Sequence, residues 1–327
     1  MGIDSLSKTI DVAKLPMAIT AKAFCRFSLG YPRDALEQLE RYLQMSSAKP
    51  NAAELAFLFS GMGIANYFLG RTDDAIRAQL TALSYAKRVG DDARVSTIAS
   101  NLCTVYMGRG DYDDSIRYGE MSVQFGETSS SSGLLISYTN LIDPYILSGK
   151  HDAALECLEK ARRWLGPERR WKLRLTFLIE EACFAVLRHN VGLALDLISQ
   201  MELVARGREE IVLMPGAYWK MRTFRMAHIG QADEAYATIS TLAASWKTRA
   251  AYHYLDMLAA KSWLEMQKCG KVRPETTQDL EIFNDLGLRG RKELLTLQGF
   301  LLPTDSSSGT ESVQPKWKYG RRYPDQH

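Results

Sequence analysis

The chain has little of what most catalytic and metal sites require. Its five cysteines lie far apart, and no two have the spacing of a metal-binding or redox motif. Its five histidines include no pair one helical turn apart, and none stands beside a Cys or Asp in a nucleophile motif. Glycine-rich phosphate loops are absent, since the SGMG at 60 lies within a helical pattern. The sequence therefore predicts a protein that is not an enzyme and that uses no metal or cofactor.

The chain also lacks a large excess of either charge and any long run of apolar residues. Lys and Arg number 41 against 38 Asp and Glu, so the net charge of +3 gives no broad basic field and weighs against nucleic acid as a partner. No stretch approaches the roughly 18 uncharged apolar residues of a membrane-spanning helix, and the first residues do not resemble a secretory signal. We expect a cytoplasmic protein with reduced cysteines and no membrane partner.

The sequence does contain a recurring mark, in which a glycine precedes acidic residues, a small residue and an apolar one. Its small residue recurs at intervals of 40, 40, 39 and 81. The marks are GYPRDAL at 30, GRTDDAI at 70, GDYDDSI at 110, GKHDAAL at 149 and GQADEAY at 230.

The double interval predicts a hidden unit near 194. HNVGLAL at 189 provides it, with Ala194 in register and His189 in place of the glycine. One period beyond the last mark, Gly270 opens GKVRPET, where Glu275 and Thr276 replace the small and apolar residues. This decay is typical of the end of a repeat array.

Each mark predicts a helix, a tight turn and a second helix. Glycine suits the left-handed backbone of the turn, and the acidic residues suit the first turn of the new helix. The small residue allows two antiparallel helices to pack closely. The period therefore predicts an all-α solenoid of about six to seven helix-turn-helix repeats over residues 15–302.

These residues resemble the tetratricopeptide repeat. Tyr106 and Tyr145 match its aromatic position, Gly63 matches its small position before the turn, and Ala75 and Ala154 match its alanine. The 40-residue unit exceeds the standard 34, so the chain is similar to the longer repeats of kinesin light chains and of maltose-regulator-type transcriptional activators. A HEAT or armadillo array fits the unit length equally well, but the Gly, Asp, Ala turn favours the tetratricopeptide kind.

The resemblance implies that ligands bind a concave groove lined by the first helix of each pair. Mapping the family's contact positions onto this chain gives a candidate binding line. Its residues are Ser100, Asn101, Thr104, Thr139, Asn140, Asp143, Glu180 and Lys220.

Asn101 and Asn140 occupy the same place in consecutive units, where an amide can bond the main chain of an extended peptide. The alternative is that both amides bond a neighbouring repeat. Asp143 and Glu180, opposed only by Lys220, suggest a mildly acidic groove that prefers a basic or neutral ligand.

Three segments lie outside the regular pattern. Residues 1–14 are expected to be a capping helix or the second helix of a truncated repeat, and 303–327 a disordered basic and aromatic tail. The basic stretch RRWLGPERRWKLR at 162–174 is either a rim for an acidic partner or a solvated loop between repeats.

The resemblance implies a non-catalytic scaffold that binds a peptide or protein partner. The alternative is the ligand-sensing arm of a bacterial regulator, with a small-molecule effector.

Overall fold

The computed structural model describes residues 19, 22–23, 26, 30–45, 50–129, 133–165, 170–209 and 214–301. Over these residues the chain is all helical, with no β-strand. Successive helices pack as adjacent antiparallel pairs, which confirms the predicted α-solenoid. The predicted N-terminal cap at 1–14 and the tail at 303–327 lie outside the described residues.

The helices in chain order are α3 (Pro32–Met45), α4 (Ala52–Phe68), α5 (Thr72–Arg88), α6 (Asp92–Arg109), α7 (Tyr112–Thr128), α8 (Leu134–Leu147), α9 (His151–Leu165), α10 (Trp171–Leu187), α11 (Val191–Ala205), α12 (Pro215–His228), α13 (Ala232–Trp246), α14 (Ala251–Cys269), α15 (Pro274–Leu280), α16 (Ile282–Asp285) and α17 (Arg289–Leu297).

The turns between paired helices have the backbone that the repeat mark predicts. The mark's glycine is left-handed in each unit, as at Gly110 with φ 93°. In the unit without the glycine, His189 takes φ 55°, the one positive φ at a non-glycine residue in the described chain. Its turn closes like the others, because the next amide, that of Asn190, donates to the Ala185 carbonyl at 3.0 Å. The fold thus holds His189 in a conformation that glycine adopts at lower cost.

The small residue of each mark lies at the contact between its two helices. The predicted positions are all fully buried, with 0% of their surface exposed. They are Ala35, Ala75, Ser115, Ala154, Ala194 and Ala235. In the degraded seventh unit the buried position falls on Thr276, whose hydroxyl donates to Glu265 of α14 at 3.0 Å, while Glu275 is exposed.

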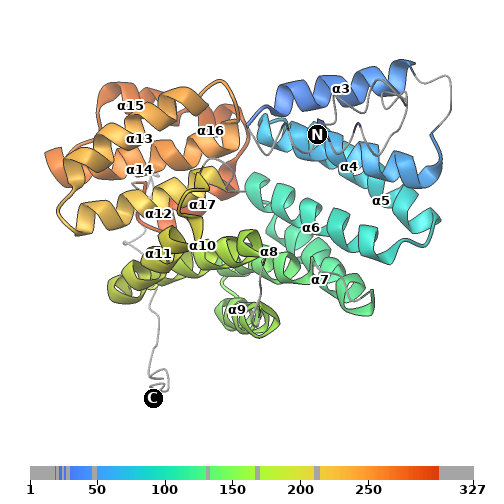
Figure 1. Cartoon of the computed structure of the whole chain (residues 1–327), viewed down its shortest axis with the longest axis horizontal. Helices are drawn as coiled ribbons and strands as arrows, with labels where there is room; N and C mark the ends of the chain where they lie inside the picture. The colour runs from blue at the N-terminus through green and yellow to red at the C-terminus, as the bar shows by residue number, and fades with distance from the viewer. Residues whose placement is uncertain are drawn as a thin grey trace, which may run out of the picture.

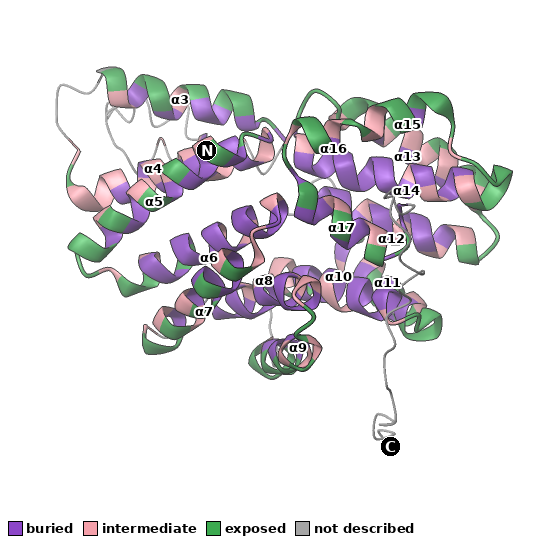
Figure 2. Ribbon diagram, turned by 180° about the vertical axis from the view of Figure 1, so that it is seen from behind, coloured by how far each residue is buried: buried purple, intermediate pink, exposed green. Residues whose placement is uncertain are grey.

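The pairs form a curved array whose two ends meet (Figure 1). The first helices of consecutive pairs, α4, α6, α8, α10, α12 and α14, contact one another in order and form the inner face. The second helices lie outside them, with α9 on the outer side of α8 (Figure 1). In Figure 2 the inner helices are largely buried, whereas exposed residues concentrate on the outer helices and the turns.

Aromatic side chains close the array between its first and last repeats. Tyr67 of α4 packs on Tyr252 of α14, with ring centroids 4.9 Å apart. Phe68 packs on His253 at 4.9 Å, and His253 also meets the ring of Trp246 at 5.4 Å. These contacts make the solenoid a closed ring, which the repeat pattern does not predict.

Helix α17 lies inside this ring and contacts α6 and α8 (Figure 1). Gly290 fits against the α6 backbone so closely that an added Cβ would stand 1.9 Å from the Met107 carbonyl oxygen. Leu294 and Leu295 of α17 are buried, and so is Leu288, the residue just before the helix. The groove that the resemblance implies is therefore partly filled by the chain's own helix.

Within the described residues, no helix is both long enough and apolar enough to cross a membrane.

Candidate functional site

The eight predicted groove residues all lie on the helices of the inner face. Ser100, Asn101 and Thr104 are on α6; Thr139, Asn140 and Asp143 are on α8; Glu180 is on α10 and Lys220 on α12. The structure therefore brings these residues onto one face of the protein. One end of that face carries neutral amides and hydroxyls, and the other end carries charged side chains.

The first end is a ladder of amides and hydroxyls, here called the amide ladder, formed by Ser60, Ser100, Asn101 and Asn140. Asn140 Nδ2 donates to Ser100 Oγ at 2.9 Å, and Asn101 Nδ2 donates to Ser60 Oγ at 3.4 Å. Each asparagine thus bonds the preceding repeat, as the alternative reading of these residues expects. The bonds use the Nδ2 donors and leave the Oδ1 acceptors outside the ladder.

The neighbouring hydroxyls are turned toward their own helices. Thr104 donates to the Ser100 carbonyl at 3.3 Å, and Thr139 donates to the Ile136 carbonyl at 3.0 Å. Ser100 and Thr139 are buried, whereas Thr104, Asn101 and Asn140 keep partial exposure. A ligand on this end would meet the two asparagines and Thr104.

The second end is a cluster of five charged side chains, here called the charge cluster: Asp143, Glu180, Lys220, Asp256 and Arg291. It draws one residue from each of α8, α10, α12, α14 and α17. With every group ionised, three acids and two bases leave a net charge of −1.

The two cations of the cluster are buried and engaged with the C-terminal half of the ring. Lys220, 1% exposed, donates to Gln298 Oε1 at 2.8 Å and lies 3.8 Å from Asp256 Oδ1. Arg291, 4% exposed, donates to the same Asp256 oxygen. Burial alone would raise the pKa of Asp256, but Arg291 and Lys220 hold it below its ordinary value. Asp256 is therefore ionised and neutralised inside the protein.

Asp143 and Glu180 have no such partner within the described residues. Both are half-buried, and neither makes a hydrogen bond or ion pair there. Burial raises the pKa of both carboxyls, and the charge of Asp143 adds to the rise at Glu180, whose pKa reaches about 8. Arg291 and Lys220 act on both groups only at longer range. The cluster thus holds two half-buried carboxyls that have no hydrogen-bond or ion-pair partner in the described chain.

Sequence reasoning missed Asp256 and Arg291. Asp256 lies outside the family's contact positions, and Arg291 lies beyond the last repeat, so neither follows from the 40-residue register. For Asp256 the signal was a charge within the strongly apolar helical stretch AYHYLDMLAA, whereas Arg291 lies in the charged stretch RGRKE and carried no such signal. A charge at such a position requires a buried partner.

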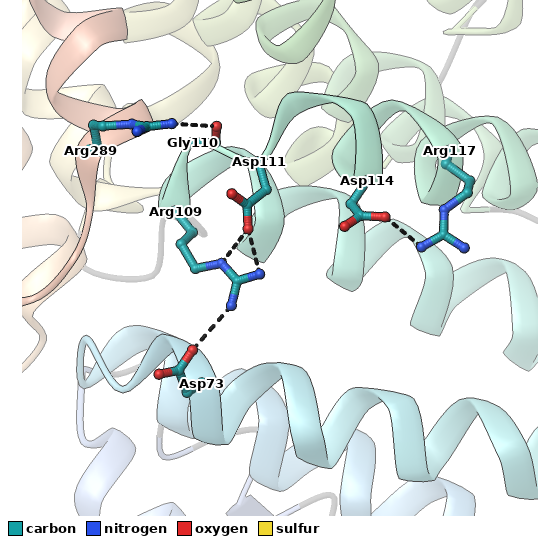
Figure 3. Close-up of polar contacts among 7 residues, drawn as sticks. All are labelled: Asp73, Arg109, Gly110, Asp111, Asp114, Arg117 and Arg289. Carbon is teal, nitrogen blue, oxygen red and sulfur yellow. Dashed lines mark hydrogen bonds and ion pairs between the residues drawn. The ribbon is translucent and has the colours of Figure 1, made fainter.

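Polar contacts at one end of α17 fix the helix that carries Arg291. Arg289 donates to the Gly110 carbonyl at 3.0 Å, at the turn between α6 and α7 (Figure 3). In the same region Arg109 bridges Asp111 and, at 3.1 Å, Asp73 of α5 (Figure 3). Glu293 of α17 accepts a hydrogen bond from Tyr112. The bonds of Arg289 and Glu293 place α17 against the C-terminal end of α6 and the start of α7.

Two pockets flank α17. One, of about 550 Å³, lies between α14, α15 and α17, and its lining includes Met266, Leu280 and Lys292. The other, of about 700 Å³, lies between α16, α17 and the C-terminal end of α8, and its lining includes Leu147 and Leu297. Neither pocket is lined by the unpaired carboxyls.

The basic stretch at 162–174 shows local pairing where it is described. Arg162 pairs with Glu181, and Arg163 with Glu159 at 3.7 Å. Lys172 stacks over Trp171 at 5.7 Å. The residues named here belong to α9 and α10 and not to the charge cluster, and residues 166–169 between the two helices lie outside the described residues.

The buried thiols are poorly suited to nucleophilic chemistry. Burial raises the pKa of Cys103 and of Cys183 to about 12, so both remain protonated near neutral pH. In the described part of the chain, no group of three or more His, Cys, Asp or Glu residues could hold a metal ion.

Comparison with known proteins adds no assignment. No protein-family model matches this chain, and a search of curated proteins finds no significant relative. The description of the site therefore depends on the structure alone. The inner face of the ring carries the neutral amide ladder and, next to it, two carboxyls without a partner in the described chain.

Proposed function

We propose that the chain is a non-catalytic interaction module that binds a basic segment of a partner on the inner face of α6, α8 and α10. The proposal rests on the two half-buried carboxyls of Asp143 and Glu180, which have no partner among the described residues. A group that keeps partial access and lacks a counter-ion gains most from a cationic ligand, because the surrounding low dielectric strengthens the attraction.

The amide ladder supports binding of an extended segment beside the carboxyls. The Oδ1 atoms of Asn101 and Asn140 lie outside the ladder bonds and could accept main-chain N–H donors one repeat apart. Lysine and arginine side chains of the same segment would then reach Asp143 and Glu180. Because α17 fills part of the ring, the segment must be short.

Selection from a random peptide library displayed on phage tests the proposal. The native chain is immobilised beside an Asp143→Asn, Glu180→Gln variant, which keeps the shape of both side chains and removes their charge. We expect the native chain to enrich peptides with Lys or Arg, and the variant to lose that enrichment at least tenfold. Enrichment of the same sequences on both proteins would contradict the proposal.

An Asp73→Asn, Asp113→Asn variant is the matched control. Asp113 is exposed at the surface, and Asp73 is exposed apart from its bond to Arg109. The control removes the same charge from outside the ring. It should retain the basic enrichment, which separates a local site from a general effect of net charge.

A second candidate is the ligand-sensing arm of a regulator. Closure of the ring by α4 and α14, with α17 inside, favours a small ligand over a long one. A cationic small molecule such as an alkylguanidine or a polyamine would then raise the melting temperature of the native chain and not that of the Asp143→Asn, Glu180→Gln variant.

A further inference from the structure

The charge cluster has a candidate counter-ion within the same chain. Lys316, Lys318, Arg321 and Arg322 lie within seven consecutive residues of PKWKYGRRYP, which contains no acidic residue. This stretch, residues 315–324, is here called the basic segment and lies outside the described residues. Its charge is opposite to that of the ionised carboxylates of Asp143 and Glu180.

The described chain ends beside the charge cluster. Gln298 accepts the hydrogen bond from Lys220, and Lys220 Nζ lies 5.2 Å from the centre of the Phe300 ring. Phe300 and Leu301 are both buried. The last described residues therefore lie next to Lys220 of α12. Helix α12 contacts α10, which carries Glu180.

The number of intervening residues is sufficient for return to the carboxyls. Fourteen residues lie between Leu301 and Lys316, and a chain of that length spans at most about 50 Å. Attachment to the same molecule also gives an effective concentration on the order of millimolar, so a weak local affinity is enough for occupancy.

We propose that the basic segment docks on the inner face of the ring, with its lysine and arginine side chains on Asp143 and Glu180. Guanidinium and ammonium groups form charge-assisted hydrogen bonds with carboxylates, and the guanidinium fork can bind one carboxylate through two bonds. Docking in this way occupies the site proposed above for a partner, so its regulatory meaning rests on that proposed function. A partner would then have to displace the segment.

The charges around the site set a pH dependence. The groups that face the two carboxyls are Lys220 from α12, Asp256 from α14 and Arg291 from α17. Glu180 is largely protonated near neutral pH because of burial and the neighbouring Asp143. A bound cation favours the ionised carboxylate, so docking releases a proton and strengthens as pH rises from 6 to 9.

Zero-length cross-linking of the full-length chain with a carbodiimide tests the docking directly, because it joins a lysine amine to a carboxyl only where the two are in contact. We expect peptides that join Lys316 or Lys318 to Asp143 or Glu180. A mixture of isotopically labelled and unlabelled protein should give these peptides without mixed labels, as an intramolecular contact requires. Cross-links spread over exposed carboxylates outside the ring, or confined to mixed-label pairs, would overturn the proposal.

Charge variants of the full chain provide the second measurement. Replacement of Lys316, Lys318, Arg321 and Arg322 by glutamine should increase the affinity for a lysine- and arginine-containing peptide from the phage selection at least tenfold. The matched control replaces four exposed cations elsewhere, Arg33, Arg41, Lys87 and Arg88, by glutamine. It should change the affinity less than twofold, and equal gains in both variants would contradict competition at the site.

The two proposals can fail separately. Specific cross-links, without any peptide selected by the chain whose four basic-segment cations are replaced by glutamine, would remove the partner site and retain the docked segment. Selected basic peptides without the specific cross-links would retain the partner site and remove the docked segment.

Discussion

The two ends of the inner face differ in how completely their polar groups are satisfied. In the amide ladder, Asn101 and Asn140 each bond a serine one repeat away, so their donors stabilise the stacking of repeats. In the charge cluster, Asp256 is neutralised by two cations, while Asp143 and Glu180 are left without a partner in the described chain. Residues at equivalent positions of a repeat can thus be architectural in one unit and available for a ligand in the next.

The largest effect should come from breaking the neutralised half of the charge cluster. Arg291→Met leaves the fully buried Asp256 with only Lys220, 3.8 Å away. We expect a loss of about 3–5 kcal/mol in the free energy of unfolding, the usual cost of an uncompensated buried charge. Urea unfolding followed by circular dichroism measures it.

The double variant Arg291→Met, Asp256→Leu is the control for that loss. Removal of both charges should restore most of the stability. A single variant that loses less than about 1 kcal/mol would show that Asp256 is not held by Arg291 in the way described.

A somewhat smaller effect should follow from displacing α17, on which Arg291 depends. Gly290→Ala places a Cβ 1.9 Å from the Met107 carbonyl oxygen, and we expect a loss of about 2–3 kcal/mol from overpacking. Hydrogen exchange should accelerate at residues 289–297. Gly192→Ala is the matched control, because its added Cβ would meet nothing within 4 Å beyond its chain neighbours and its own helix backbone, and it should lose no stability.

The unpaired half of the cluster should respond to pH. The folded-state pKa of Glu180 is raised to about 8, so its ionisation costs stability as pH rises from the ordinary glutamate value toward 8. Glu180→Gln removes that cost. We expect the variant to exceed the native chain by about 1–3 kcal/mol at pH 9, allowing for partial solvent access, and to match it at pH 5.

Thermal unfolding at the two pH values is the measurement for Glu180→Gln. Asp279→Asn is a useful contrast, because bonds to Lys247 and Tyr254 lower the pKa of Asp279 despite the opposing effect of burial. Loss of that carboxylate should destabilise the chain at pH 9, opposite to Glu180→Gln. An identical response of the two variants would refute the distinction between paired and unpaired carboxyls.

The smallest effect should lie in the amide ladder. Asn140→Ala removes a donor 2.9 Å from Ser100 Oγ, whereas Asn101→Ala removes one 3.4 Å from Ser60 Oγ. We expect a loss of about 1 kcal/mol for the first and a few tenths for the second, as their bond lengths suggest. Equal losses, measured by chemical denaturation, would argue against the ladder as the reason for their placement.

Local and periodic features of this fold could be predicted from sequence, whereas features created by closure could not. The turn marks located the paired helices and even the hidden unit at Ala194, because a 40-residue period repeats the same close packing. Ring closure through Tyr67 and Tyr252 joins residues 185 positions apart and follows no period. The entry of α17 into the ring is equally non-periodic.

The candidate site also has features that follow the repeat period and features that do not. The register placed Asn140, Asp143, Glu180 and Lys220 on one face, since inner positions recur with the repeat. It could not show that Lys220 is committed to Gln298, because that residue comes from the non-repeating end of the chain. Because of that contact, Lys220 acts on Glu180 only at longer range and forms no ion pair with it.

The titration of Glu180 by carboxyl ¹³C NMR tests the central claim most directly, with the resonance assigned by its absence in Glu180→Gln. In the chain with the basic segment neutralised, Glu180 should titrate with a pKa of about 8. Addition of a peptide containing lysine and arginine should lower that pKa. A Glu180 that titrates at the ordinary glutamate value and does not respond to the peptide would contradict an unpaired carboxyl awaiting a cation.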